Sequence, residues 1–119
     1  MKVQLRKDYN RIMPCRKQYL TPGKVYEVIG IECDDYRIVN DRNDPRLGMD
    51  PVLYPPKLFV IVDATEPPDW VSRVDDGCRY AYPPELNARG YWERYHDGIP
   101  EAIEVSKAYL AKSRKEDHG

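Results

Sequence analysis

The sequence predicts an α+β fold that is mainly β, with a small barrel or strongly bent sheet of about five strands and one or two helices after it. Short runs rich in β-branched residues, separated by turn signals, fill residues 1–63. Helical periodicity is absent from that half and is found only near the C-terminus. A chain of 119 residues has the length of one domain.

Five short strands are expected in the first half, over residues 2–6, 25–33, 36–40, 51–54 and 58–62. The polar, basic stretch 7–18 is predicted as an irregular loop, and residues 41–50 as a long polar loop. The last strand is apolar enough to be buried on both faces.

The strand over residues 25–33 carries the strongest β pattern. Gly30 in its interior indicates a bulge or a sharp bend, as small barrels need at their corners. Asp34 and Asp35 form a tight turn into the next strand, so the two strands make a hairpin. The alternation places Tyr26 and Val28 on one face and Val25, Ile29 and Ile31 on the other.

The second half is expected to be a C-terminal extension, residues 64–119, that packs on the barrel as part of one domain. Residues 63–87 are predicted to be irregular, because two Pro-Pro pairs impose extended geometry. A short helix is expected over residues 89–96 and a longer one over residues 100–112, where Pro100 suits a first helical turn. The apolar stripe of the longer helix is Ala102, Ile103, Val105, Tyr109 and Leu110.

The net charge of −1 conceals an uneven distribution. Residues 1–23 hold six bases and one acid, residues 24–76 hold twelve acids and six bases, and residues 77–119 hold seven of each. One interpretation of the acidic middle segment is solvated turns, where Asp is favoured for backbone reasons. The other is a surface that steers a basic partner.

The expected cellular location and the expected oxidation state of the cysteines rest on motifs that the sequence does not contain. No apolar run suits a transmembrane helix or a signal peptide, so a cytoplasmic protein without a membrane partner is expected. Cys15, Cys33 and Cys78 are odd in number and have no CxxC spacing. Three reduced thiols are therefore expected.

Groups suited to catalysis or metal binding are scarce. His96 is the one plausible catalytic imidazole, since His118 lies in a charged tail. No Ser or Cys motif accompanies His96, and although Cys78 could lie near it in the fold, the same is true of almost any Cys and His in a small domain. Residues 41–52 fail as a calcium loop, because Arg46 and Val52 occupy the Gly and Glu positions. No catalytic residue, metal, cofactor or small-molecule substrate is expected, and a small enzyme built on His96 is kept as a rival hypothesis.

The main alternative function is that of a nucleic-acid-binding or phage accessory barrel. Small barrels bind nucleic acid through aromatic side chains ringed by bases. The aromatics are present here, with ten Tyr and two Trp, but the basic cluster is confined to the N-terminal stretch. The rest of the barrel is acidic, which would repel phosphates.

Five segments of the first half carry a family resemblance: Met1 to Val3 (MKV), Leu20 to Val28 (LTPGKVYEV), Asp35 to Asp41 (DYRIVND), Leu53 to Pro55 (LYP) and Leu58 to Asp63 (LFVIVD). Together they resemble a pattern in small bacterial and phage proteins with an SH3-like β-barrel. The resemblance covers about residues 1–63 and implies such a barrel there. The long loops over residues 7–18 and 41–50 depart from the pattern.

The second half, through residues 69–72, 76–77, 82–86 and 90–98, resembles the tails of small immunity proteins. Those proteins are encoded beside bacterial polymorphic or secreted toxins and neutralise them by binding. The resemblance implies a non-enzymatic, toxin-neutralising immunity protein whose partner is a cognate toxin domain, basic where the toxin attacks nucleic acid. The residues expected to contact that partner are Asp34, Asp35, Asp41, Asp44, Asp69, Trp70, Asp75, Asp76, Tyr80 and Tyr82.

Overall fold

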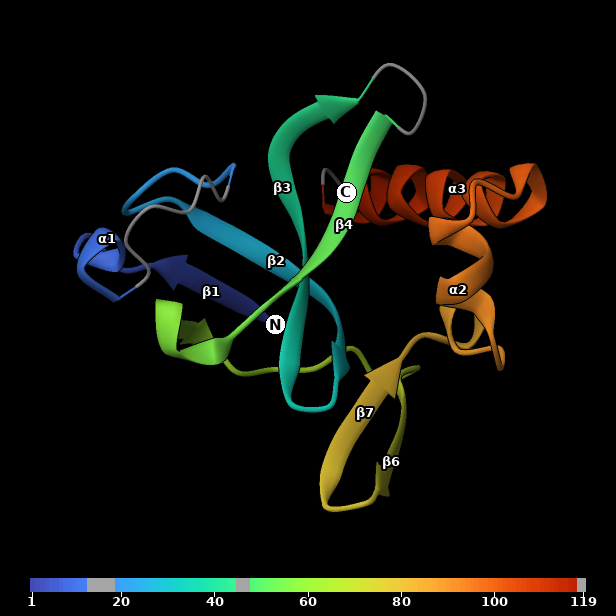
Figure 1. The fold of residues 1–119 in the computed structure, drawn as a ribbon, viewed down its shortest axis with the longest axis horizontal. Helices are drawn as coiled ribbons and strands as arrows, with labels where there is room; N and C mark the ends of the chain where they lie inside the picture. Colours follow the sequence, from blue (N-terminus) through green and yellow to red (C-terminus); the bar gives the residue numbers. More distant parts are fainter. Residues whose placement is uncertain (13–18, 45–47, 118–119) are drawn as a thin grey trace.

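Seven strands and three α-helices make up the part of the chain described by the computed structural model, residues 1–12, 19–44 and 48–117 (Figure 1). Side chains are described for these residues except 10, 12, 43–44, 48–50 and 113–117. The α+β, mainly β fold expected from the sequence is confirmed. The elements are β1 (Lys2–Leu5), α1 (Tyr9–Ile12), β2 (Val25–Glu32), β3 (Asp35–Asp44), β4 (Gly48–Tyr54), β5 (Phe59–Asp63), β6 (Val71–Asp75), β7 (Cys78–Tyr82), α2 (Tyr91–His96) and α3 (Pro100–Asp117), with 3-10 turns at Pro56–Leu58 and Pro84–Leu86.

The strands form one antiparallel sheet with the order β4-β3-β2-β1-β5. The first and last of the five strands expected in residues 1–63 therefore pair with each other. Figure 1 shows β3 and β4 running at a steep angle to β1 and β2, so the sheet is strongly bent. The β6–β7 hairpin joins through β7, which pairs with β2 at Ile31 and Ala81.

The bend in β2 lies where Gly30 predicted it. The pairing of β2 with β3 shifts register between Val28 and Gly30. Tyr26 and Val28 lie in the barrel core, as the alternation predicts, but the irregularity brings Ile31 to the same side and leaves Ile29 in the other cluster. The expectation that Ile29 and Ile31 share a face was therefore wrong.

Two clusters of buried side chains form the interior. The barrel core comprises Val3, Leu5, Leu20, Tyr26, Val28, Ile31, Tyr36, Ile38, Tyr54, Leu58, Phe59 and Ala81. The helical core, which packs α2 and α3 against the sheet, comprises Ile29, Tyr82, Leu86, Tyr91, Trp92, Tyr95, Ala102, Ile103 and Leu110. Most of the C-terminal aromatics thus serve to pack the extension on the barrel.

The expectation of an irregular segment over residues 63–87 was wrong, because β6 and β7 form a hairpin there. Its turn, Asp76-Gly77, has φ of 55° and 80°. Positive φ at both central residues is the mark of a type I′ turn, for which Asp-Gly is a favoured pair. The Asp76-Gly77 dipeptide by itself predicts a hairpin, but the two Pro-Pro pairs on either side of it led to the prediction of an irregular segment.

Three element boundaries differ from the sequence prediction. The predicted loop 41–50 is mostly strand, because β3 continues through Asp44 and β4 begins at Gly48. The predicted loop 7–18 contains α1, and α3 continues to Asp117 rather than ending at residue 112. Val105 is exposed, unlike its predicted neighbours on the apolar stripe.

The last barrel strand was also misjudged. Val60, Ile61 and Val62 were expected to be buried on both faces, yet they are 49%, 54% and 55% exposed. The cause is position, since β5 is an end strand that pairs with β1 alone among the described strands. An apolar run predicts a strand but does not say whether a neighbour covers it.

Gly30 has a steric role that gives a first testable prediction. A Cβ atom at this position would overlap the ring of Tyr82, which crosses β2 there. Gly30→Ala should therefore lower the free energy of unfolding by about 1–3 kcal/mol, as overpacking does. In a Tyr82→Leu background the same change should cost markedly less, because the ring is absent. Urea denaturation of the four variants measures this coupling, and an equal cost in both backgrounds would contradict the steric account.

Candidate functional site

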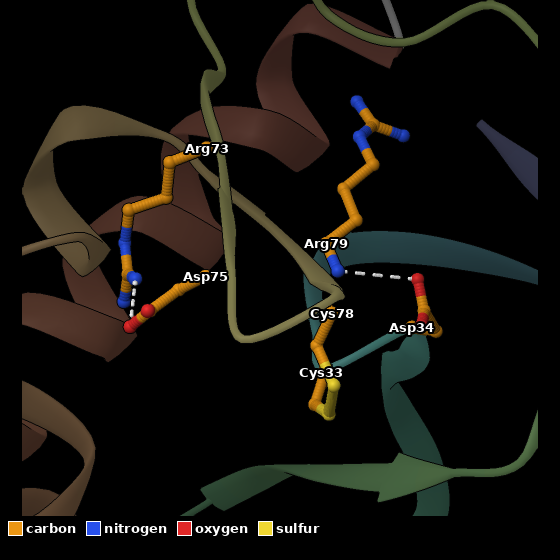
Figure 2. Close-up of a disulfide and its surroundings, with 6 residues drawn as sticks. All are labelled: Cys33, Asp34, Arg73, Asp75, Cys78 and Arg79. Carbon is orange, nitrogen blue, oxygen red and sulfur yellow. Dashed lines mark hydrogen bonds and ion pairs between the residues drawn. A yellow bond between two sulfur atoms is a disulfide. The ribbon is translucent and has the colours of Figure 1, made fainter.

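Two tight turns lie side by side at one end of the molecule. The β2–β3 turn has Cys33 and Asp34 at its centre with φ of 46° and 68°, so it has the type I′ form, as does the turn of the β6–β7 hairpin. The Asp34 N–H donates to the Arg79 carbonyl oxygen at 3.0 Å. In return, the Arg79 N–H donates to the Asp34 Oδ1 at 3.2 Å (Figure 2). These bonds hold the turns together.

A disulfide between Cys33 and Cys78 adds a covalent link between the same two turns (Figure 2). The two residues are 45 positions apart in the chain, and their Cα atoms are 4.5 Å apart. The expectation of reduced thiols was wrong for this pair, because the sequence did not reveal that the two hairpins meet. Cys15, the third cysteine, lies outside the described residues.

We call Asp34, Asp35, Asp75 and Asp76 the acidic end. These four of the ten predicted contact residues are brought together by the paired turns. Asp34, Asp75 and Asp76 are exposed, and Asp35 is half-buried. Burial, together with the negative charges of Asp34 and Glu32, raises the pKa of Asp35 above its ordinary value. Within the acidic end, Asp34 and Asp35 therefore repel each other.

The two faces of the β6–β7 hairpin have different roles. The register places Arg73 opposite Tyr80, and the Arg73 guanidinium lies 4.3 Å from the centre of the Tyr80 ring. Arg73 also pairs with Asp75 at 3.2 Å, and Figure 2 shows both side chains on the side away from Arg79. On the other face, Arg79 binds the carboxylate of Glu66. The first face therefore remains open to a ligand, while the second is tied to the segment before β6.

A cleft of about 750 Å³ lies between the open face of the hairpin and α2. Its walls carry aromatic groups together with charges of both signs. The side chains that matter here are Glu32, Arg37, Arg73, Asp75, Tyr80, Tyr82, Arg89, Trp92, Glu93 and His96. Asp75 belongs to both the cleft and the acidic end, so the two features form one continuous surface.

Arg37 is a buried cation in the wall of this cleft. Its side chain is 2% exposed, and its guanidinium lies 3.8 Å from the centre of the Trp92 ring. The Nε donates to the Tyr82 hydroxyl at 3.0 Å, and an Nη donates to the Glu32 Oε1 at 3.2 Å. Burial raises the pKa of Tyr82 far above its ordinary value, so its hydroxyl keeps its proton and donates it to Glu32. No sequence pattern predicts this cluster, because an Arg in a β-strand usually indicates a solvent-facing position.

The two tyrosines predicted to contact a partner differ in exposure. Tyr82 is 3% exposed and belongs to the helical core, so it forms part of the buried wall of the cleft. Tyr80 is half-buried beneath Arg73 and lines the cleft directly. Both come from β7, where alternate residues face the same side.

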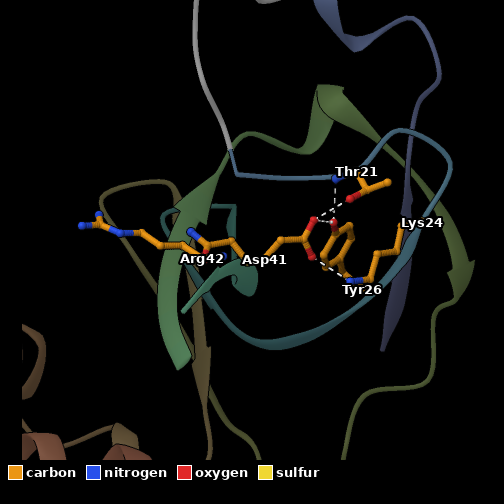
Figure 3. A network of polar contacts seen from close by, with 6 residues as sticks. Thr21, Lys24, Tyr26, Asp41 and Arg42 are labelled. Carbon is orange, nitrogen blue, oxygen red and sulfur yellow. Dashed lines mark hydrogen bonds and ion pairs between the residues drawn. The ribbon is translucent and has the colours of Figure 1, made fainter. Parts of the chain in front are cut away.

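Asp41 lies six positions beyond Asp35 on β3 and belongs to a separate network (Figure 3). Its carboxylate accepts hydrogen bonds from the hydroxyls of Thr21 and Tyr26 at 2.6 and 2.7 Å, and from the Lys24 ammonium at 2.7 Å. Partial burial opposes the charged form, but these hydrogen bonds outweigh it and lower the pKa of Asp41. Asp41 therefore fastens the start of β2 to β3.

The remaining predicted contact residues are not at the acidic end. Asp69 and Trp70 lie in the segment before β6, where Asp69 is exposed and Trp70 packs partly against the barrel core. Asp44 ends β3, and its side chain lies outside the description. The acidic surface is thus smaller than the sequence predicted.

His96 and Cys78 do not form a nucleophile–base pair in this structure. Cys78 is held in the disulfide, and His96 is exposed, with its ring against Trp92 and Tyr95. Within residues 1–12, 19–44 and 48–117, no group of three His, Cys, Asp or Glu side chains is placed to hold a metal ion.

The Asp41 network gives a prediction about pH. The pKa of this carboxyl is lower in the folded protein than its unfolded value of about 3.9, so its contribution to stability is present above that pH and is lost as the pH falls through the folded pKa. Asp41→Asn should therefore lower the free energy of unfolding near pH 7 and make progressively less difference below about pH 4. Urea denaturation of both proteins across this range measures the effect, and a pH-independent difference would contradict it.

Comparisons with known proteins give no match: no family model, no curated protein and no solved structure is similar to this chain. Over the described part of the chain, no helix has the length and apolar composition needed to cross a membrane. The acidic end and its cleft are therefore the features from which we infer a function.

Proposed function

We propose that this protein works by binding a basic protein partner on the acidic end and the adjoining cleft. Following the resemblance of its C-terminal half, the partner is a toxin domain and the protein is its immunity protein. One observation carries the proposal: two turns distant in sequence are clamped together so that four carboxylates share one end of the molecule.

Electrostatics favour a cationic partner here. Exposed acids that cluster on one end attract a basic protein over a long range and speed its association. Burial, and after it the negative charges of Asp34 and Glu32, raise the pKa of Asp35. A cation bound beside Asp34 and Asp35 favours the charged form of both carboxylates, so binding should lower the pKa of Asp35.

Rigidity favours tight binding. The type I′ turns, the reciprocal Asp34–Arg79 hydrogen bonds and the Cys33–Cys78 disulfide fix the acidic end before any partner arrives. A surface that is already ordered loses less conformational entropy on binding. The cleft beside it offers Arg73 stacked on Tyr80, and Arg and Tyr are residue types that often dominate binding energy.

The test is co-expression with the C-terminal domain encoded by the gene immediately upstream. The chain should relieve the growth arrest that this domain causes and should bind it in vitro. Asp75→Asn with Asp76→Asn should slow association about tenfold or more at low salt, with a smaller effect at high salt. Asn keeps the shape of Asp and tolerates the positive φ of Asp76.

The matched control is Glu101→Gln with Glu104→Gln on α3, which removes the same charge from exposed positions away from the turns. Figure 1 shows α3 and the β6–β7 hairpin at separate parts of the molecule. Association should be unchanged in this control. Equal slowing in both pairs, or no protection by the wild-type chain, would contradict the proposal. Retardation of labelled DNA or RNA at moderate salt would favour the nucleic-acid alternative instead.

A further inference from the structure

The edge of β5 is the second unusual surface of the molecule. Val60, Ile61 and Val62 are consecutive and about half exposed. Among the described strands, β5 pairs only with β1, so its other edge is open. An exposed, apolar edge strand is a ready template for another strand. The pairing of β5 with β1 is regular from Phe59 to Ile61, and a register shift then leaves Val62 as an extra residue before Asp63.

The register shows that both faces of this edge are apolar. Val60 lies opposite Gln4 and shares its face, whereas Ile61 lies opposite Val3. Val3 is 0% exposed in the barrel core, so Ile61 extends a row of core side chains to the edge of the sheet. A further strand alongside β5 would continue both faces of the sheet.

The backbone of β5 is oriented to accept such a strand. The Arg6 N–H donates to the Leu58 carbonyl oxygen at 2.9 Å, which turns the polar groups of Leu58 toward β1. In an antiparallel ladder these groups alternate between the two sides. Those of Val60 therefore face β1, and the N–H and C=O of Ile61 face the open edge.

We propose that β5 pairs antiparallel with β5 of a second copy, about a two-fold axis at Ile61. This places Ile61 opposite Ile61 of the second copy, and Val60 opposite the Val62 of that copy, so that the half-exposed apolar side chains cover each other. Because the relationship is symmetric, two hydrogen bonds form between the Ile61 backbones.

Charge complementarity selects the antiparallel second copy. Lys57 precedes β5, and Asp63 ends it. An antiparallel pair brings the Lys57 end of each strand to the Asp63 end of the other, whereas a parallel pair would bring like charges together. Figure 1 shows β1, the strand with which β5 pairs, on the side of the molecule away from α2 and α3.

The first test is the mass in solution, measured by sedimentation equilibrium over a dilution series. The wild-type chain should approach about twice its 13.9 kDa at high concentration. Ile61→Lys should stay monomeric, because it puts like charges at the two-fold axis, and Val74→Lys, a matched change of an exposed valine on β6, should dimerise as the wild type does. Circular dichroism checks that both variants are folded. A monomeric wild type up to about 1 mM, or an undiminished dimer of Ile61→Lys, would overturn the proposal.

A cross-linking experiment tests the contact itself. In a Cys15→Ser background, Ile61→Cys should be joined into a covalent dimer by a short bis-maleimide, since the two Ile61 residues face each other. Val74→Cys in the same background should stay monomeric. A dimer that cross-links through Val74→Cys and not through Ile61→Cys would place the interface elsewhere and overturn the proposal. The result is independent of the proposed function, which concerns the acidic end.

Discussion

The stacking of Arg37 on Trp92 is the contact on which the arrangement of this molecule depends. Arg37 belongs to β3 of the barrel, and Trp92 belongs to α2 of the extension. A buried cation is costly unless its hydrogen bonds are satisfied, and here they are provided by the Tyr82 hydroxyl, the Glu32 carboxylate and the Pro51 carbonyl oxygen. One charged side chain of the barrel sheet thus reaches two members of the helical core, Trp92 and Tyr82.

The position of the candidate site follows from this contact. Tyr82 comes from β7, so the Arg37 cluster fixes the base of the β6–β7 hairpin, and the disulfide with its neighbouring hydrogen bonds fixes the turn. The hairpin is held at both ends, with the cleft on one side and the Arg79–Glu66 ion pair on the other. A partner would therefore meet a preformed surface, and the energy of binding would not be spent on ordering it.

Local sequence patterns predicted much of the fold. They did not predict the contacts between residues far apart in the sequence. The strand over residues 25–33, the bend at Gly30 and the last helix were predicted because each has its own signal in a short window. The apolar run of β5 predicted a strand but not its edge position, which depends on the order of the whole sheet. The Cys33–Cys78 disulfide and the burial of Arg37 arise from segments about 45 residues apart, and no local pattern contains that information. The acidic end was predicted in part, because its Asp residues are visible in the sequence, whereas the role of Asp41 in holding β2 to β3 is not.

Because of its contacts with Trp92 and Tyr82, Arg37 should make the barrel and the C-terminal extension unfold as one unit. Arg37→Met keeps the length of the side chain and removes its charge and hydrogen bonds. In a Trp70→Phe background, Trp92 is the only indole, so its fluorescence reports on the helical core while far-UV circular dichroism reports on the whole chain. With Arg37 present, the two urea transitions should coincide. With Arg37→Met, the Trp92 transition should come first, at a stability lower by about 3 kcal/mol. Coincident transitions with an unchanged midpoint in Arg37→Met would contradict the account.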